Sequence, residues 1–292
     1  MKNKKNIFFK SSFSNAKFEL LSLKNNLYLK KKIINPNIRD FESIKKNNFF
    51  LKNFKIKNLK INKIEIENFK TLKKKKYFIM NYINGYSSDL ILKNLGVNEI
   101  KILREFLKNY FLRLKESTKW EKIERKFFLQ KINNVKKNIK QKELLKLFND
   151  NEKYFFKKLN KIEYYPTGIC HGDLTLSNMI IKNDKIYLID FLNTYKDSIV
   201  QDLSKIYQEF ILGWSSRFLN GNDIVRSKII CENIVDKKFF KSFSKEMLTV
   251  LEFEIILTLL RIFPYVKKND IMTIKWLKES MNKIKKLNIN LI

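Results

Sequence analysis

Histidine, cysteine, proline and glycine are all scarce in this chain. Its 292 residues include one His, two Cys, three Pro and six Gly. Cys170 and Cys231 lie far apart without metal-ligand spacing, and a single His leaves too few nitrogen ligands, which argues against an ordinary zinc site. Two isolated cysteines are typical of reduced thiols in a cytoplasm. The N-terminal residues MKNKKNIFFKSSF contain no long apolar run, so we expect a cytoplasmic protein without a signal peptide.

Long apolar runs are also rare elsewhere in the chain. The most apolar stretch, residues 250–266, contains Glu252, Glu254 and Arg261. Ionisable residues at these positions indicate a buried helix rather than a membrane span. We therefore predict no membrane-spanning segment.

The balance of charge is strongly positive. The chain has 61 Lys+Arg against 29 Asp+Glu, which gives a formal net charge of +32. A basic nucleic-acid-binding protein is compatible with this balance and stays open as an alternative. However, only seven of the cations are Arg, and the lysines occur throughout the chain with many Asn, Ile and Phe residues. These residues share A- and T-rich codons, so we attribute the charge to genome composition and expect no specific nucleic-acid partner.

The first part of the chain carries strand patterns, and no glycine precedes Gly85. Alternating apolar residues predict three antiparallel strands within residues 5–34 and a further buried strand in residues 77–86. Residues 35–53 have the pattern of a helix. The apolar side of this helix is predicted to hold Ile38, Phe41, Ile44 and Phe49. We expect a small nucleotide-binding domain formed by residues 1–84.

The rest of the chain has mainly helical patterns. Apolar residues recur every three or four positions in residues 88–117 and 119–161, and helices resume from Asp202 to the C-terminus. Between them, residues 180–191 predict a short hairpin that turns at Asn183-Asp184. We expect a helical catalytic and substrate-binding domain formed by residues 85–292, and an α+β fold overall.

One loop holds the only histidine and the residues best suited to chemistry. Its sequence is His171-Gly172-Asp173-Leu174, followed by Asn178 and, beyond the hairpin, by Ile189-Asp190-Phe191. Asn178 leads into the first strand of the hairpin and Asp190 follows the second, so the hairpin can bring an amide and a carboxylate together. Mg²⁺ takes few protein oxygens beside phosphates and water, so two such side chains suffice to bind it.

This pattern resembles the kinase catalytic loop, H-R-D-L-x-x-x-N followed by D-F-G, with Gly172 in place of Arg. It is more similar to the loop of the aminoglycoside phosphotransferase and choline kinase family, whose members phosphorylate small molecules. The resemblance implies a bilobal protein-kinase-like fold, with a small antiparallel-sheet N-lobe and a larger, mainly helical C-lobe. It also implies that Asp173 accepts the proton of the substrate hydroxyl, and that Asn178 and Asp190 bind Mg²⁺.

Two neighbouring residues have implied supporting roles. His171 is expected to brace the loop through a hydrogen bond to backbone or to a neighbouring carboxylate, with a role as general base as the alternative. Asp202, in the sequence Gln201-Asp202-Leu203-Ser204, is expected to support the loop from the following helix. A role for Asp202 as an ordinary helix N-cap is an alternative.

The resemblance also implies which residues bind the nucleotide. Lys30 is expected to contact the phosphates, with Lys32 as the alternative on the same face of the strand. Glu42, on the following helix, is expected to pair with that lysine. The backbone groups of Asn81 and Ile83 are expected to bind the adenine.

We therefore expect a small-molecule O-kinase that uses ATP or GTP together with Mg²⁺. Its partners would be the nucleotide and a small hydroxyl-bearing substrate, for which we favour a sugar, an amino sugar or a choline-like amino alcohol of cell-envelope metabolism. Asp197, Glu209 and Trp214 are candidates for holding a cationic acceptor. By resemblance, residues 11–20 cover the phosphates, yet they contain no glycine. That departure keeps open a catalytically inactive kinase-fold module that binds nucleotide, and the sequence indicates no oligomeric state.

Overall fold

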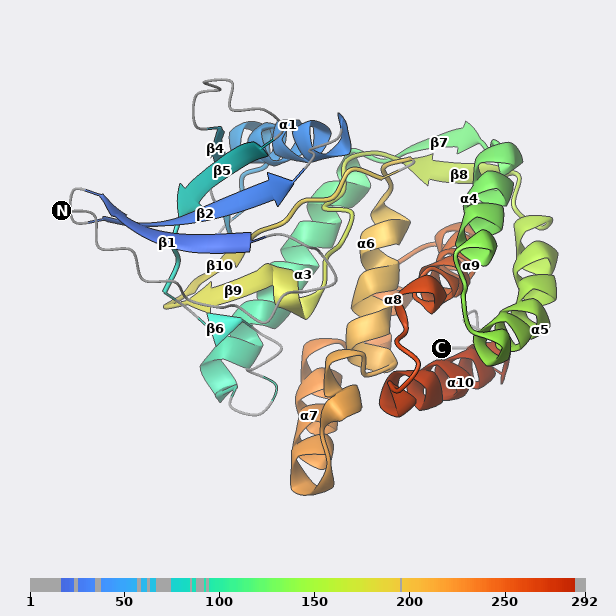
Figure 1. Cartoon of the computed structure of the whole chain (residues 1–292). Coiled ribbons are helices and arrows are strands. Elements are labelled where there is room, and N and C mark those ends of the chain that lie inside the picture. The colour runs from blue at the N-terminus through green and yellow to red at the C-terminus, as the bar shows by residue number, and fades with distance from the viewer. Residues whose placement is uncertain are drawn as a thin grey trace. The chain divides into compact units, whose positions relative to one another are not determined.

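The computed structural model describes most of the chain (Figure 1). The described residues are 17–23, 26–34, 38–56, 59–61, 64–66, 75–84, 86–87, 92, 95–194 and 196–286. The chain divides into two compact units. The first unit comprises Met1–Ser87 and Asn178–Asn193, and the second comprises Ser88–Ser177 and Thr194–Ile292.

Some expectations for the N-terminal region fall outside the described residues. These are the first of the three predicted strands and residues 11–16 of the predicted phosphate-covering loop, whereas residues 17–20 belong to strand β1. The expected domains, 1–84 and 85–292, divide the chain once. The first unit also includes Asn178–Asn193, so the expected domains stay a prediction.

The described residues of the first unit form two four-stranded sheets. One sheet has the order β1 (Lys17–Leu23), β2 (Asn26–Ile34), β5 (Lys75–Asn81) and β4 (Ile64–Ile66), and the other has the order β3 (Leu59–Ile61), β10 (Lys185–Leu188), β9 (Met179–Lys182) and β6 (Tyr86–Ser87). All pairs are antiparallel except β3 with β10, which run parallel. The alternating apolar residues predict strands at the positions of β1, β2 and β5, and these three strands are confirmed. The hairpin of β9 and β10 is confirmed as well, and Asn183 at its turn adopts φ 55°.

Helix α1 (Ile38–Asn53) follows β2 and confirms the predicted helix. Ile44 and Phe50 are buried, whereas Phe49 is 48% exposed, so the expected inward position of Phe49 was wrong. Phe50 contacts Phe191, with 4.9 Å between ring centroids. The residue after Asp190 is thereby packed against α1 within the first unit.

The second unit is mainly helical. Its α-helices are α3 (Val97–Glu116), α4 (Arg125–Lys137), α5 (Lys142–Leu159), α6 (Ile199–Ile206), α7 (Gly221–Ile234), α8 (Lys237–Lys241), α9 (Lys245–Leu260) and α10 (Ile271–Lys286). The π-helix η2 (Tyr207–Ile211) continues α6, and the short 3-10 helices are η3 (Ser215–Phe218), η4 (Phe263–Tyr265) and η1 (Leu176–Asn178), which ends where the chain enters the first unit.

A short strand pair corrects one expectation for this unit. The predicted helix over residues 119–161 is wrong at its start, where β7 (Lys119–Lys122) pairs with β8 (Tyr164–Thr167). All four residues of β7 are exposed, so the apolar pattern of the segment gives no sign of the strand. The pairing connects two segments that are separated by α4 and α5. The loop that holds His171 follows the second of them, β8.

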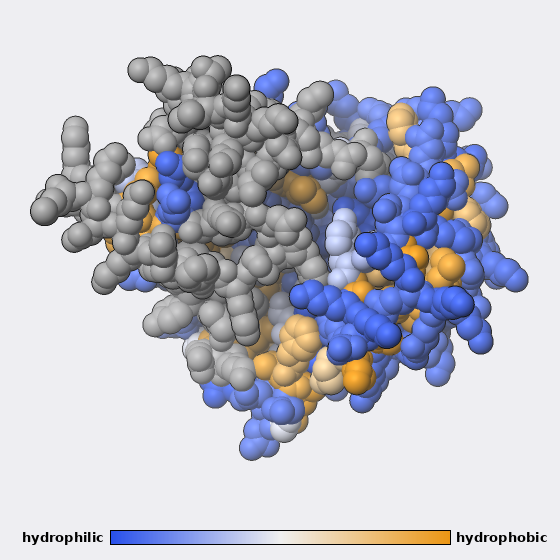
Figure 2. Space-filling view, in the orientation of Figure 1, coloured by the Kyte–Doolittle hydropathy of each residue, from blue (hydrophilic) through white to orange (hydrophobic). Residues whose placement is uncertain are grey.

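Helix α9 has a long buried stretch, with every residue from Val250 to Leu260 buried. Its two internal carboxylates accept hydrogen bonds from tyrosines, Glu252 from Tyr154 (2.8 Å) and Glu254 from Tyr165 (3.0 Å). The prediction of a buried helix is therefore confirmed. Among the described residues, no helix is both long enough and apolar enough to span a membrane. On the face shown in Figure 2, the described residues are mostly hydrophilic, with smaller hydrophobic areas between them.

Candidate active site

The loop from His171 to Ser177 follows β8 in the second unit and is mostly buried. Gly172 adopts φ 90°, a conformation that a residue with a Cβ rarely takes. This geometry accounts for glycine between His171 and Asp173, because a larger residue would strain the turn that presents the carboxylate of Asp173.

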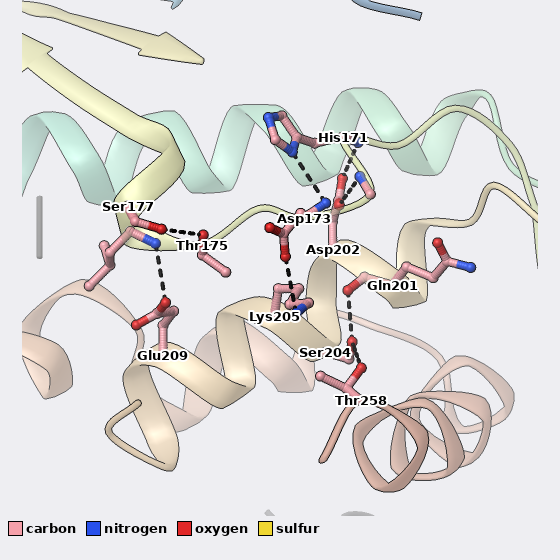
Figure 3. Close-up of polar contacts among 12 residues, drawn as sticks. His171, Asp173, Thr175, Ser177, Gln201, Asp202, Ser204, Lys205, Glu209 and Thr258 are labelled. Carbon is pink, nitrogen blue, oxygen red and sulfur yellow. Dashed lines mark hydrogen bonds and ion pairs between the residues drawn. The ribbon is translucent and has the colours of Figure 1, made fainter. Parts of the chain in front are cut away.

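Asp202 holds the backbone of this loop from α6 (Figure 3). Its carboxylate accepts hydrogen bonds from the amides of His171 (2.6 Å) and Gly172 (2.8 Å), and also from the hydroxyl of Tyr110 (2.7 Å). Asp202 is fully buried, so these donors replace the water that the carboxylate loses on folding. The N-cap of α6 is Ser198, whose side chain accepts from the amide of Val200, so the N-cap alternative for Asp202 is wrong.

His171 is fully buried, and one nitrogen of its ring faces the backbone of Asp173 (Figure 3). Nδ1 of His171 accepts a hydrogen bond from the amide of Asp173 at 3.3 Å. This contact joins the imidazole to the backbone of the residue expected to act as the base. The contact is a hydrogen bond to backbone, as expected for a residue that braces the loop. The bracing role of His171 stays a prediction.

Asp173 forms an ion pair that the sequence reasoning missed. Nζ of Lys205, on α6, lies 3.0 Å from Oδ1 of Asp173, and the two side chains are 16% and 32% exposed. Burial acts to raise the pKa of Asp173, but the charge and hydrogen bond of Lys205 outweigh this effect and hold the pKa below its ordinary value. The signal that could have found Lys205 is its position three residues after Asp202, on the same side of a helix.

Glu209 contacts the far end of the same loop. Its carboxylate accepts hydrogen bonds from the amide of Leu176 (3.4 Å) and from the hydroxyl of Ser215 (2.7 Å). Glu209 is fully buried, and burial raises its pKa to about 7. Its side chain is therefore buried and hydrogen-bonded within the protein, and a contact with a cationic acceptor stays a prediction.

The other two acceptor candidates also have partners. One face of the Trp214 ring is covered by Arg217, whose guanidinium carbon lies 3.4 Å from the ring centroid. Asp197 accepts a hydrogen bond from the hydroxyl of Thr194 at 2.6 Å. A cationic acceptor would have to displace Arg217 to use that face of Trp214, which weakens the case for a choline-like cage there.

The two expected metal ligands both lie in the first unit, at the open end of the hairpin. The amide of Ile189 donates to the carbonyl of Asn178 at 3.1 Å, so the backbones beside Asn178 and Asp190 are adjacent. Asp190 adopts φ 54°, which is unusual for a residue other than glycine and is often found at functional sites. An amide oxygen and a carboxylate oxygen are donors that suit Mg²⁺. Among the described residues, no cluster of three or more His, Cys, Asp or Glu side chains could hold a metal ion.

Helix α1 contacts the three residues that follow Asp190. Nζ of Lys46 donates to the carbonyl of Leu192 at 2.9 Å, and the carboxylate of Glu42 accepts from the side-chain amide of Asn193. These contacts fix the segment after Asp190 to α1. The pairing of Glu42 with Lys30 stays a prediction.

The remaining nucleotide candidates lie in the sheet of the first unit. Lys30 lies in β2 opposite Glu19 and Ile79, and it is partly exposed. Asn81 ends β5 and Ile83 follows it, after Tyr82, whose amide donates to the carbonyl of Leu27 at 2.8 Å. This hydrogen bond extends the pairing of β5 with β2 just past Asn81. Contacts of Lys30, Asn81 and Ile83 with a nucleotide stay predictions.

The elements of the two units define an α+β fold of the protein-kinase-like type, shared with small-molecule kinases of known structure. A spectinomycin phosphotransferase, solved with ADP and spectinomycin, aligns over 97% of this chain and 92% of that chain, with a TM-score of 0.56 and 15% identity. An amicoumacin kinase, solved with AMP-PNP and Ca²⁺, aligns over 98% and 91%, with a TM-score of 0.58 and 9% identity. A choline/ethanolamine kinase family protein from Mesorhizobium loti aligns over 94% and 90%, with a TM-score of 0.52 and 12% identity.

A family model matches part of the sequence. Residues 108–223 match the model of the phosphotransferase enzyme family, and this region contains both the His171 loop and Asp202. The resemblance to small-molecule phosphotransferases predicted from the loop is thus confirmed. A probable bifunctional tRNA threonylcarbamoyladenosine biosynthesis protein of Methanosarcina mazei is 30% identical over 80 residues, which cover 21% of this chain and 15% of that protein.

Proposed function

We propose that this protein is a small-molecule O-kinase, which moves the γ-phosphoryl group of ATP or GTP to a hydroxyl group with the help of Mg²⁺. The observation that carries the proposal is the fixed position of Asp173. The residue lies in a loop whose backbone is anchored to Asp202, and its carboxylate is paired with Lys205. A loop of this kind within the region that matches the phosphotransferase enzyme family supports a catalytic role rather than nucleotide binding alone.

In the proposed reaction, Asp173 accepts a hydrogen bond from the acceptor hydroxyl and orients its oxygen. A bond forms between that oxygen and the γ-phosphorus, and the bond from the γ-phosphorus to the bridging oxygen of the β-phosphate breaks. The hydroxyl proton passes to the carboxylate of Asp173, and the nucleoside diphosphate leaves with the electron pair of the broken bond. The low pKa of Asp173 suits this role, because the base must be ionised before transfer.

The donors for Mg²⁺ and nucleotide would come from the first unit. Asn178 and Asp190 would hold Mg²⁺, which would neutralise charge on the phosphates. We assign phosphate contact to Lys30 and adenine contact to the backbones of Asn81 and Ile83. Similar structures solved with ADP or AMP-PNP support the choice of a nucleoside triphosphate as the phosphoryl donor.

The proposed acceptor is a small alcohol such as a sugar, an amino sugar or an amino alcohol. The buried state of Glu209 and the stacking of Arg217 on Trp214 argue for an acceptor held by other groups than these. Similar proteins of known structure include kinases for glucosamine, spectinomycin and amicoumacin, which supports this class of acceptor.

The proposal is tested by incubating the full chain with ATP or GTP, Mg²⁺ and a panel of sugars, amino sugars and amino alcohols. Formation of nucleoside diphosphate that depends on both Mg²⁺ and one class of alcohol supports the proposal. Mg²⁺-dependent nucleotide binding without transfer to any alcohol would instead favour the inactive module.

A further inference from the structure

Helix α6 and the π-helix η2 present three ionisable residues to successive positions of the His171 loop (Figure 3). Asp202 accepts hydrogen bonds from loop amides, Lys205 pairs with the carboxylate of Asp173, and Glu209 accepts from the amide of Leu176. Residues spaced by three and four positions lie on one side of a helix. The contacts of Asp202 and Glu209 are to backbone, whereas Lys205 alone of the three contacts the side chain that is expected to react.

Lys205 is more enclosed than an ordinary surface lysine. Its side chain is 16% exposed, and the buried carboxylate of Glu209 is close enough to interact with its charge. The carboxylate of Glu209 is held by Leu176 and Ser215, so the nearest anion that Lys205 contacts directly is Asp173. Ordering an enclosed lysine side chain costs rotamer entropy, which the ion pair with Asp173 helps to offset.

We propose that Lys205 is a positioning residue, whose ammonium holds the Asp173 carboxylate ionised and oriented for the acceptor hydroxyl. The inference rests on the proposed function and adds to it a residue that acts through Asp173. Nζ of Lys205 contacts Oδ1, and a carboxylate can accept several hydrogen bonds, so this contact is compatible with a second one from the hydroxyl. When the hydroxyl proton passes to Asp173, Lys205 keeps its own proton, so the proton balance of the transfer is unchanged.

In the described part of the chain, the side chains that lower the pKa of Asp173 lie on α6, in the loop and at the end of α9. Burial favours the neutral carboxyl, and it is opposed chiefly by the charge and hydrogen bond of Lys205 on α6 and, to a smaller extent, by His171 in the loop and Arg261 at the end of α9. Asp202 and Glu209 are the carboxylates on the α6 side, and both accept hydrogen bonds from the loop. Because Lys205 has the largest effect among the cations, its removal should make Asp173 easier to protonate.

Carbon-13 NMR of the Asp173 carboxyl tests the proposal on the full chain without any turnover. The signal is assigned as the one that Asp173→Asn removes. Lys205→Met and, as a second neutral replacement, Lys205→Gln should move its titration midpoint to higher pH, whereas Lys205→Arg should keep the midpoint close to that of the wild type. An unchanged midpoint in a folded neutral variant overturns the proposal.

Transfer kinetics give a second readout that a purely structural role would not change. The acidic limb of the pH–rate profile should move to higher pH in Lys205→Met, whereas in Lys205→Arg it should stay close to its wild-type position. Lys196→Met is a matched control, since Lys196 is 20% exposed and pairs with Glu121 at 2.9 Å, and it should leave the limb unchanged.

The two proposals fail in different ways. If the wild type transfers no phosphoryl group, the proposed function fails, while the NMR titration still decides whether Lys205 controls Asp173. If transfer occurs and the acidic limb is the same in Lys205→Met as in the wild type, the role of Lys205 is wrong and the proposed function stands.

Discussion

Tyr110 donates its hydroxyl hydrogen to the carboxylate of Asp202 at 2.7 Å and so connects α3 with α6 at the candidate loop. Both side chains are fully buried. Burial and the neighbouring Asp202 carboxylate raise the pKa of Tyr110 well above its ordinary value, so the phenol stays protonated and remains a donor. The same carboxylate anchors two loop amides, and the position of Asp173 therefore depends on a contact made by a residue outside the loop.

Replacement of Tyr110 by Phe should lower both stability and transfer. Loss of a hydrogen bond to a buried carboxylate costs about 1.5–3 kcal/mol, because Asp202 loses one of its donors. Urea unfolding measures the change in free energy. Tyr154→Phe is the control, since it removes a hydrogen bond to Glu252 without touching the loop, and it should lower stability while the transfer rate is kept. Wild-type stability in Tyr110→Phe would contradict the account of Asp202.

Gly172→Ala should impair the loop through backbone strain. At φ 90° a Cβ is disfavoured, and left-handed backbone costs a residue with a side chain about 1–2 kcal/mol. If the loop relaxes, Asp173 moves and the transfer rate falls. Gly221→Ala is the matched control, because Gly221 has φ 53° and nothing lies within 4 Å of its added Cβ. Equal transfer rates in the two variants would show that the Gly172 conformation does not matter to the reaction.

The pattern of residues in the sequence identifies the His171 loop and the hairpin after it, but not the strands that pair with distant segments. The hairpin of β9 and β10 follows from local alternation and a turn at Asn183, so it could be predicted with its turn, whereas its second strand ends at Leu188, before the predicted end at Phe191. The parallel pairing of β3 with β10 and the strand β7 depend on partners far along the chain, and no local pattern encodes such a partner.

The candidate site shows the same limit. Asp202 could be singled out because its sequence neighbourhood resembles a known family, but Lys205 is one of many lysines. Its position three residues after Asp202 is the one signal in the sequence, and the structure adds the contact with Asp173. The charge of Glu209 makes it a candidate for holding a cationic acceptor, and the sequence does not reveal that its carboxylate is buried and bonded to Leu176 and Ser215.

Stability should depend on pH through Glu209. Its folded pKa of about 7 lies above the ordinary value of 4.5, so the folded state binds more protons than the unfolded state between these values. The contribution of this group is fully present below about pH 4.5 and is lost as the pH rises through about 7. In Glu209→Gln this part of the pH dependence should disappear.

Urea unfolding at a series of pH values measures this effect. Glu143→Gln is the control, because Glu143 lies in an exposed ion pair with Lys278. In this variant the stability should fall with rising pH as it does in the wild type. A Glu209→Gln protein whose stability falls with pH as steeply as that of the wild type would contradict the assignment.

Asp190→Asn should weaken Mg²⁺-dependent nucleotide binding, since it replaces the anionic ligand of the proposed metal site. Titration calorimetry with ATP, at several Mg²⁺ concentrations, measures the change in affinity. Asp184→Asn is the matched control, because Asp184 is an exposed residue in the turn of the same hairpin. The proposed role of Asp190 is wrong if both variants bind the nucleotide with the same dependence on Mg²⁺.

Asp173→Asn tests the central claim most directly, through the transfer of γ-labelled phosphate from ATP or GTP to the preferred alcohol. The wild type should transfer the label only with Mg²⁺ present, and the folded variant should be slower by about 10²–10⁴-fold, the usual contribution of a general base. Transfer by Asp173→Asn at the wild-type rate would contradict the account.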